Sequence, residues 1–381
     1  MSGGLGELVL HTYDKNLKIN TLFGSQLCSR ELKTFSFDEN DCCILDSYGD
    51  IVNDIYLVLD FESLSFLDEY TSLSVCKNKI LYDIISNIKL YSCSGGVLEQ
   101  FSGNTMYINS LIDKRSFVTY NKKKGGGYTV VYALNFCIKE IPLVRLRYPG
   151  IKIDVKLNSK YTASLLNKYL DVNCIFLDSG DRKKYVRCIQ IDYPVNIKNE
   201  TSFKITPGDT KIILDLRKAI AGDIRDIFIY LKSSKGFIIK DALKLVSLYQ
   251  NKMLRETYKS IYLNDIFPRQ YNTIFPDDVY VVPFDLRPID QYPKGFYPAN
   301  RVEHLELSID LQENHNIDEI IICSRRYTNL ISSACVLSVQ HFKPVIEVPV
   351  IEKNEISPTS NELIKETSVK IDATNSKCHI M

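Results

Sequence analysis

The stretch Ile151-Lys152-Ile153-Asp154-Val155-Lys156-Leu157 alternates apolar and charged residues without a break, directly after the turn pair Pro149-Gly150. Because side chains on a strand point alternately to opposite faces, this pattern predicts a β-strand with one buried face. The same period of two recurs over 305–311, over 55–61 and over 189–193. Strands of this kind therefore extend from the first quarter of the chain to near its end.

Helical signals are short and few by comparison. The sequence predicts helical turns only over 104–111 and 159–170, and neither is long enough to serve as the crossover of a parallel sheet. Many short strands separated by turn residues indicate an all-β protein built from antiparallel sandwiches. A chain of 381 residues is long enough for two such domains, with a seam near 197–207. We expect one domain over residues 1–198, a second over 199–350 and a flexible polar tail over 351–381.

Composition excludes several classes of function. Hydrophobic residues make up 45% of the chain and the formal net charge is +1, whereas a protein that wraps nucleic acid carries a basic excess, so we expect no direct nucleic-acid binding. The 24 tyrosines and the absence of tryptophan suit half-buried strands. The amino terminus has neither the basic region nor the apolar run of a secretory signal, and Arg325-Arg326 interrupts the apolar stretch near Ile320, so we expect no export and no membrane span.

Cysteine and histidine usage argues against a metal site. The 11 cysteines form no C-x-x-C pair and the five histidines are scattered, so no structural zinc is predicted. An odd number of cysteines favours free thiols in a reducing compartment.

Catalytic motifs are missing as well. The run Lys122-Lys123-Lys124-Gly125-Gly126-Gly127 places its lysines before its glycines, and a strand pattern rather than a helix follows, so it predicts a hairpin tip and no phosphate-binding loop. The sequence contains no G-x-S-x-G and no H-E-x-x-H motif. We therefore predict no enzyme, no cofactor and no catalytic residue.

The last four residues fit one processing motif. Cys378-His379-Ile380-Met381 matches the C-a-a-X pattern, in which methionine at the last position favours a farnesyl group on the cysteine. The alternative is an unmodified cysteine in a cysteine-rich chain. The mass of the intact protein after eukaryotic expression distinguishes the two.

Three stretches carry more specific motifs. In the stretch Ile88–Gly103, a glycine turn at Gly95-Gly96 precedes an acidic strand, and the stretch Cys174–Arg182 reads as a strand followed by a turn. The third stretch runs from Asp278 to Val302. The motif residues of the three stretches are Gly96, Glu99, Asp178, Arg182, Tyr280, Phe284, Pro293, Gly295, Asn300 and Arg301.

Taken in order, these motifs resemble the double jelly-roll major capsid proteins of the nucleocytoplasmic large DNA viruses, over roughly residues 50–345. The resemblance implies two tandem eight-stranded antiparallel jelly rolls with short helices in the connections. It also implies a homotrimer with a pseudo-hexagonal outline that tiles an icosahedral shell, located in the virion after assembly in the host cytoplasm. Minor capsid proteins and an internal viral membrane are the further partners it implies. The long connection over 258–276, which contains Tyr and Phe, is expected to supply towers or contacts between neighbouring capsomers.

The sequence leaves two alternative functions open. A double jelly-roll scaffold of the poxvirus kind would trimerise on a membrane and then leave the particle. A glycan-binding or amidase-like protein on two tandem sandwiches belongs to another class, and an assay of sugar binding or amide hydrolysis tests it.

Overall fold

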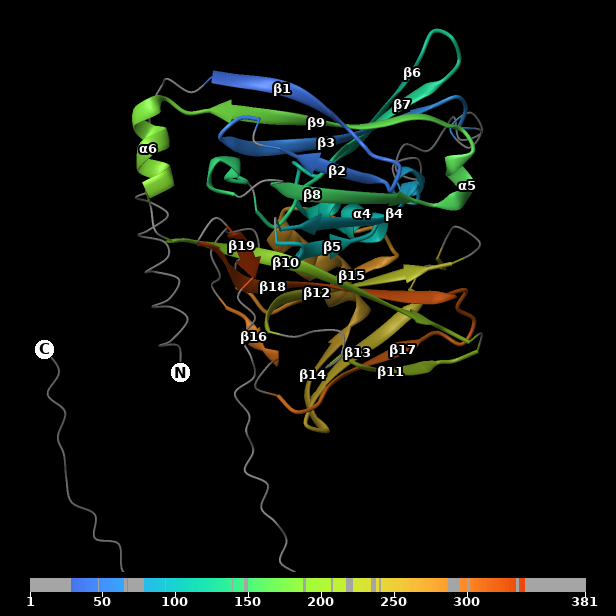
Figure 1. Cartoon of the computed structure of the whole chain (residues 1–381). Helices are drawn as coiled ribbons and strands as arrows, with labels where there is room; N and C mark the ends of the chain where they lie inside the picture. Colours follow the sequence, from blue (N-terminus) through green and yellow to red (C-terminus); the bar gives the residue numbers. More distant parts are fainter. Residues whose placement is uncertain are drawn as a thin grey trace, which may run out of the picture. The chain divides into compact units, whose positions relative to one another are not determined.

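The computed structural model of the chain describes residues 29–339, apart from 47, 65–66, 68–78, 93, 139, 147–149, 188–189, 207, 217–221, 234–237, 240, 287–294, 300–301 and 334–335. The strand pairs of this part are all antiparallel. Its strands form four sheets, two from residues 29–176 and two from residues 190–339 (Figure 1).

The first two sheets face each other across a shared core. In spatial order, the first contains β1 (Ser29–Ser36), β9 (Leu165–Phe176), β3 (Ile51–Phe61), β7 (Tyr128–Ala133) and β6 (Val118–Lys122). The second contains β2 (Cys42–Leu45), β8 (Ile151–Leu157), β4 (Ile85–Tyr91) and β5 (Val97–Phe101).

The other two sheets repeat this arrangement. One contains β10 (Gln190–Lys204), β18 (Glu319–Ser333), β12 (Asp223–Lys232) and β15 (Val279–Pro283), with β16 (Tyr297–Pro298) beside β12 and β19 (Val336–Val339) beside β18. The other contains β11 (Lys211–Asp215), β17 (Leu305–Leu311), β13 (Leu243–Gln250) and β14 (Met253–Lys259).

The order of the strands identifies the topology. When β6 is set aside, the eight remaining strands of residues 29–176, counted along the chain, lie in the orders 1-8-3-6 and 2-7-4-5. When β16 and β19 are set aside, the eight strands of residues 190–339 lie in the same two orders. Each set is an eight-stranded jelly roll, so the predicted fold class is confirmed.

Most of the predicted elements are found at the predicted residues. The stretch that alternates most strictly forms β8, and Leu305–Leu311 forms β17. The Lys122–Gly127 run is the tip of the hairpin between β6 and β7, and 104–111 lies within the helix α4 (Gly103–Ile112).

The helix predicted over 159–170 is largely wrong. Only α5 (Ser159–Thr162) is helical, and β9 starts at Leu165. Leu170, Val172 and Cys174 are fully buried on one face of β9, so pairing with β1 and β3 prevailed over the local helical preference.

The predicted boundary between residues 198 and 199 remains a prediction. It falls inside β10, whereas sheet membership changes between Phe176 and Gln190, where the helix α6 (Ser179–Arg187) connects the two rolls. The predicted tail over 351–381 lies outside the described residues.

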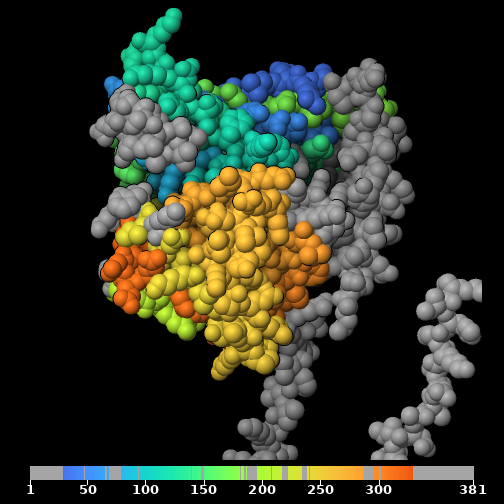
Figure 2. All heavy atoms as spheres, turned by 180° about the vertical axis from the view of Figure 1, so that it is seen from behind, coloured from blue at the N-terminus to red at the C-terminus, as the bar shows by residue number. Residues whose placement is uncertain are grey.

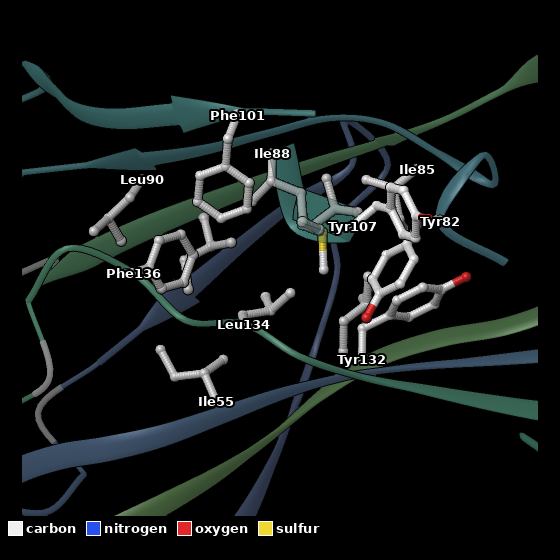
Figure 3. Packing of buried hydrophobic residues seen from close by; sticks show 14 of the residues in the cluster. Ile55, Tyr82, Ile85, Ile88, Leu90, Phe101, Tyr107, Tyr132, Leu134 and Phe136 are labelled. Carbon is white, nitrogen blue, oxygen red and sulfur yellow. The ribbon is translucent and has the colours of Figure 1, made fainter. Parts of the chain in front are cut away.

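Aromatic rings fill much of the core of the first roll. Tyr82 lies between Tyr107 and Tyr132, with ring centroids 6.0 Å and 6.2 Å away, and Phe101 packs on Phe136 at 5.5 Å (Figure 3). The buried hydroxyl of Tyr132 donates a hydrogen bond to the carbonyl oxygen of Leu81 at 2.6 Å. The buried hydroxyl group of Tyr132 therefore has a hydrogen-bond partner, as buried polar groups generally do.

Candidate assembly surfaces

A buried ion pair joins the two rolls. Lys198 Nζ, from β10, lies 3.5 Å from Glu99 Oε1, from β5, and both side chains are at most 9% exposed. The ammonium group also contacts the carbonyl oxygen of Asn135 and lies 4.9 Å from the centre of the Phe101 ring. Glu99 Oε2 accepts a hydrogen bond of 2.6 Å from the amide of Cys137. Each charge thus has several partners inside the joint.

The first turn of α4 forms a second contact in the joint. Ser102 caps this helix, and its side chain accepts a hydrogen bond from the amide of Asn104. The Ser102 hydroxyl donates to the carboxylate of Glu200, from β10, at 2.6 Å. Thr105 and the side-chain amide of Asn104 donate to the same carboxylate. A negative group at the start of a helix also interacts favourably with its dipole, so Glu200 holds α4 against the second roll.

Apolar and further charged contacts complete the joint. The rings of Tyr107, on α4, and Tyr230, on β12, lie 5.8 Å apart. Two more lysine–carboxylate pairs cross between the rolls: Lys79 contacts Asp278, and Lys232 Nζ lies 3.2 Å from Asp83 Oδ1. One buried cluster contains residues of both rolls, so the joint is a continuous packed interface.

A buried ion pair on the joint side of the second roll was not anticipated from the sequence. Arg325 Nε donates to Asp226 Oδ1 at 2.9 Å, and the hydroxyl of Tyr271 donates to Asp226 Oδ2 at 3.0 Å. Burial lowers the pKa of Arg325, but the charge and hydrogen bonds of Asp226 outweigh it and hold that pKa above its ordinary value. Burial and the charge of Asp226 raise the pKa of Tyr271 well above its ordinary value. The arginine therefore remains charged and the tyrosine remains neutral.

The sequence motifs of the first roll occupy structural positions. Gly96 belongs to the β4–β5 hairpin, where its carbonyl accepts a hydrogen bond from the amide of Ser92, and Glu99 lies in the joint described above. Asp178 precedes α6 and its carbonyl accepts from the amide of Arg182. Arg182 Nε lies 2.9 Å from Asp50 Oδ1, which ties α6 to the loop before β3.

Two motif residues of the second roll, Phe284 and Gly295, lie close together. The buried hydroxyl of Tyr280 donates to the carbonyl of Asp277 at 2.8 Å. The ring of Phe284 packs on that of Tyr297 at 5.1 Å, and a Cβ on Gly295 would lie 2.8 Å from the Phe284 carbonyl oxygen. A side chain at this glycine would therefore displace backbone. The other residues singled out in the sequence lie outside the described residues: Pro293, Asn300, Arg301 and Cys378.

An exposed apolar surface lies on β14 and on the turn that follows it, η2 (Tyr262–Ile266). We call it the β14–η2 surface. Its large apolar side chains are Met253, Leu254, Ile261, Tyr262 and Ile266, which are 43–61% exposed. Figure 2 shows this part of the chain, coloured yellow to orange, across the middle of one face. Clustered exposed apolar side chains are typical of protein–protein contacts.

A second surface lies on the outward face of the sheet β1-β9-β3-β7. Leu57 and Leu59 of β3 are fully buried in the core, so Tyr56 and Val58 point to the other side. Val58 is directly opposite both Val131 and Tyr169 in the neighbouring strands. Val58 itself is only 4% exposed between its neighbours, and Tyr56, Val131 and Tyr169 are half-buried. We call the surface formed by these four residues the open sheet face. It is bordered by the carboxylates of Asp54, Asp60 and Asp171.

The possible metal ligands and the thiols can be placed in the described part of the chain. No group of three or more His, Cys, Asp or Glu residues is placed to hold a metal ion there. The five cysteines that are described, Cys42, Cys43, Cys137, Cys174 and Cys323, are free thiols. Among the described helices, none is long and apolar enough to cross a membrane.

Comparison with known proteins finds likeness in structure rather than in sequence. No family model matches the chain, and no curated protein matches it in sequence. A protein of the PBCV-1 virus capsid superposes with a TM-score of 0.70 at 14% identity, over 83% of this chain and 97% of that one. The Faustovirus major capsid protein superposes with a TM-score of 0.60 at 9% identity, over 86% and 98%. A protein of Sulfolobus Turreted Icosahedral Virus gives 0.51 at 10% identity, over 79% and 90%. These are viral capsid proteins rather than enzymes, and the chain shares their double jelly-roll fold.

Proposed function

We propose that this protein is a structural subunit of a viral capsid. The observation that carries the proposal is the extent of the likeness: the chain matches nearly the whole length of capsid proteins, with the same two rolls in tandem and no large part of those proteins unmatched. Fold alone does not define function, so the packing of the two rolls and the exposed surfaces add necessary support.

In the proposal, three copies form a capsomer. Two similar rolls in each of three chains give six similar wedges, and a pseudo-hexagonal outline of this kind tiles a shell. The charged and apolar joint supports this arrangement, because it packs the two rolls of a chain directly against each other. A net charge of +1 lets many copies pack side by side without strong mutual repulsion.

The finer parts of the proposal concern location and partners. The capsomers would form the shell of a virion, over an internal membrane and in contact with minor capsid proteins. We propose residues 1–198 and 199–350 as the two structural domains, in which the sequence-motif residues serve to stabilise the rolls. Residues 351–381 form a tail, and a farnesyl group on Cys378 would link this tail to lipid.

The mass of the purified full-length protein tests the proposal. Light scattering after size exclusion is expected to give three times 43.7 kDa, about 131 kDa. A monomer at every concentration up to that of an assembly reaction contradicts it. Immunodetection in purified mature particles then separates a shell subunit, which is retained, from a scaffold, which is lost.

A further inference from the structure

The joint inside the chain provides a template for a contact between chains. On the first roll, the joint uses the fifth strand, β5, and the helix that follows it, α4. On the second roll, it uses the outward face of the sheet β10-β18-β12-β15, which lies next to the first roll (Figure 1). Phe228, Tyr230 and Cys323 of this sheet belong to the same buried cluster as residues of the first roll.

Each half of this joint has an equivalent that lies outside the joint in the described part of the chain. Because the two rolls share one strand order, β14 is the equivalent of β5, and η2 occupies the place of α4 after the fifth strand. The sheet β1-β9-β3-β7 is likewise the equivalent of β10-β18-β12-β15. The two unused halves are therefore the β14–η2 surface and the open sheet face.

The segment that follows the fifth strand is buried in the first roll and exposed in the second. On α4, Thr105, Met106 and Tyr107 are buried. In the equivalent segment of the second roll, Ile261 and Ile266 are 54% and 43% exposed. Large apolar side chains left in water at the place where the other roll makes its joint indicate a surface that a partner covers.

We propose that the β14–η2 surface of one copy docks on the open sheet face of the next copy. This contact is heterologous, since different surfaces of the two copies meet, and contacts of this kind form a ring when the rotation between copies closes. The number of copies in the ring rests on the proposed function. Each chain supplies two rolls, so three chains close a ring of six rolls. The subunit contact then repeats the joint within the chain.

A photo-crosslinking residue in place of Ile261 tests the contact in the full-length protein. Crosslinks to peptides of β3, β7 or β9 of another copy are expected, in a ladder that ends at the trimer. Crosslinks between two β14–η2 surfaces, or to residues 340–381 of the same chain, would overturn the inference.

Charge substitutions give an independent measurement. The double substitution Ile261→Glu, Ile266→Glu changes exposed side chains, so the monomer is expected to keep its circular dichroism spectrum while the apparent dissociation constant of the trimer rises at least tenfold. Ile213→Glu is the matched control, because Ile213 is 62% exposed on β11, at the opposite edge of the same sheet, and it should leave the trimer intact. A double variant that trimerises like the unsubstituted protein refutes the docking surface alone. An unsubstituted protein that stays monomeric refutes the proposed function together with it.

Discussion

Replacing Lys198 by methionine should weaken the joint between the rolls by several kilocalories per mole. The substitution keeps most of the side-chain volume but removes the charge that faces Glu99, whose carboxyl group is fully buried. Glu99 then retains the hydrogen bond from the amide of Cys137 and has no countercharge in the described joint. Removing one partner of a buried ion pair typically costs about 3–5 kcal/mol. Because one hydrogen bond remains, we expect the lower end, about 3 kcal/mol.

Urea unfolding followed by circular dichroism measures this loss, at one protein concentration for all variants because self-association adds to stability. With a slope of about 3 kcal/mol per molar urea, the midpoint should fall by about 1 M. Adding Glu99→Gln to Lys198→Met removes the isolated charge, so the double variant should recover most of the loss. Lys123→Met is the control: Lys123 is 46% exposed, and Asp60, at 15%, keeps the hydrogen bond from Thr129, so stability should change by less than about 1 kcal/mol.

Two results would refute the reasoning. One is a midpoint for Lys198→Met within the error of the unsubstituted protein. The other is a double variant no more stable than Lys198→Met, which would mean that the cost arises from packing around the lysine rather than from an unpaired Glu99.

Two further predictions concern the first roll. Gly103→Ala should destabilise the protein by about 1–3 kcal/mol in the same urea assay, because the new Cβ would lie 1.9 Å from the carbonyl oxygen of Tyr82. Gly125→Ala is the control and should leave stability unchanged, because no atom lies within 4 Å of its new Cβ. Burial raises the pKa of Asp113, but hydrogen bonds from Arg115 outweigh it and lower that pKa to about 2. The stabilisation by Asp113 is therefore complete above about pH 4 and is lost as the pH falls toward 2. Asp113→Asn should remove about 1–2 kcal/mol of this acid-dependent stability. The expected loss is small because Arg115 is largely exposed. An unchanged stability difference between pH 4 and pH 2 in that variant would contradict the assignment.

The sequence predicts the strands that have one covered face, because a single buried face produces a period of two. The 151–157 stretch follows this rule, and β17 follows it except at Ser308, which is buried on the other face. β12 does not, because its sheet lies between the core of its own roll and the first roll, and nearly every residue from Asp223 to Leu231 is buried. Local pattern cannot show that a second domain covers the outer face of a strand.

The same limit explains the charged residues that sequence reasoning missed. Asp226 and Arg325 lie 99 positions apart and meet only because β12 pairs with β18. The motif residue Glu99 was identified from the sequence, but its partner Lys198 belongs to the other roll. The exposed apolar residues of η2 lie in the connection over 258–276 that the sequence indicated as a contact segment, yet their exposure follows only from the fold.

The most direct test of the central claim is an image of the purified protein. Two-dimensional class averages from negative-stain electron microscopy should show particles of three subunits with a six-sided outline, since each chain carries two rolls of one topology. A three-subunit particle with a plainly triangular or open outline, or a field of monomers, would contradict the account.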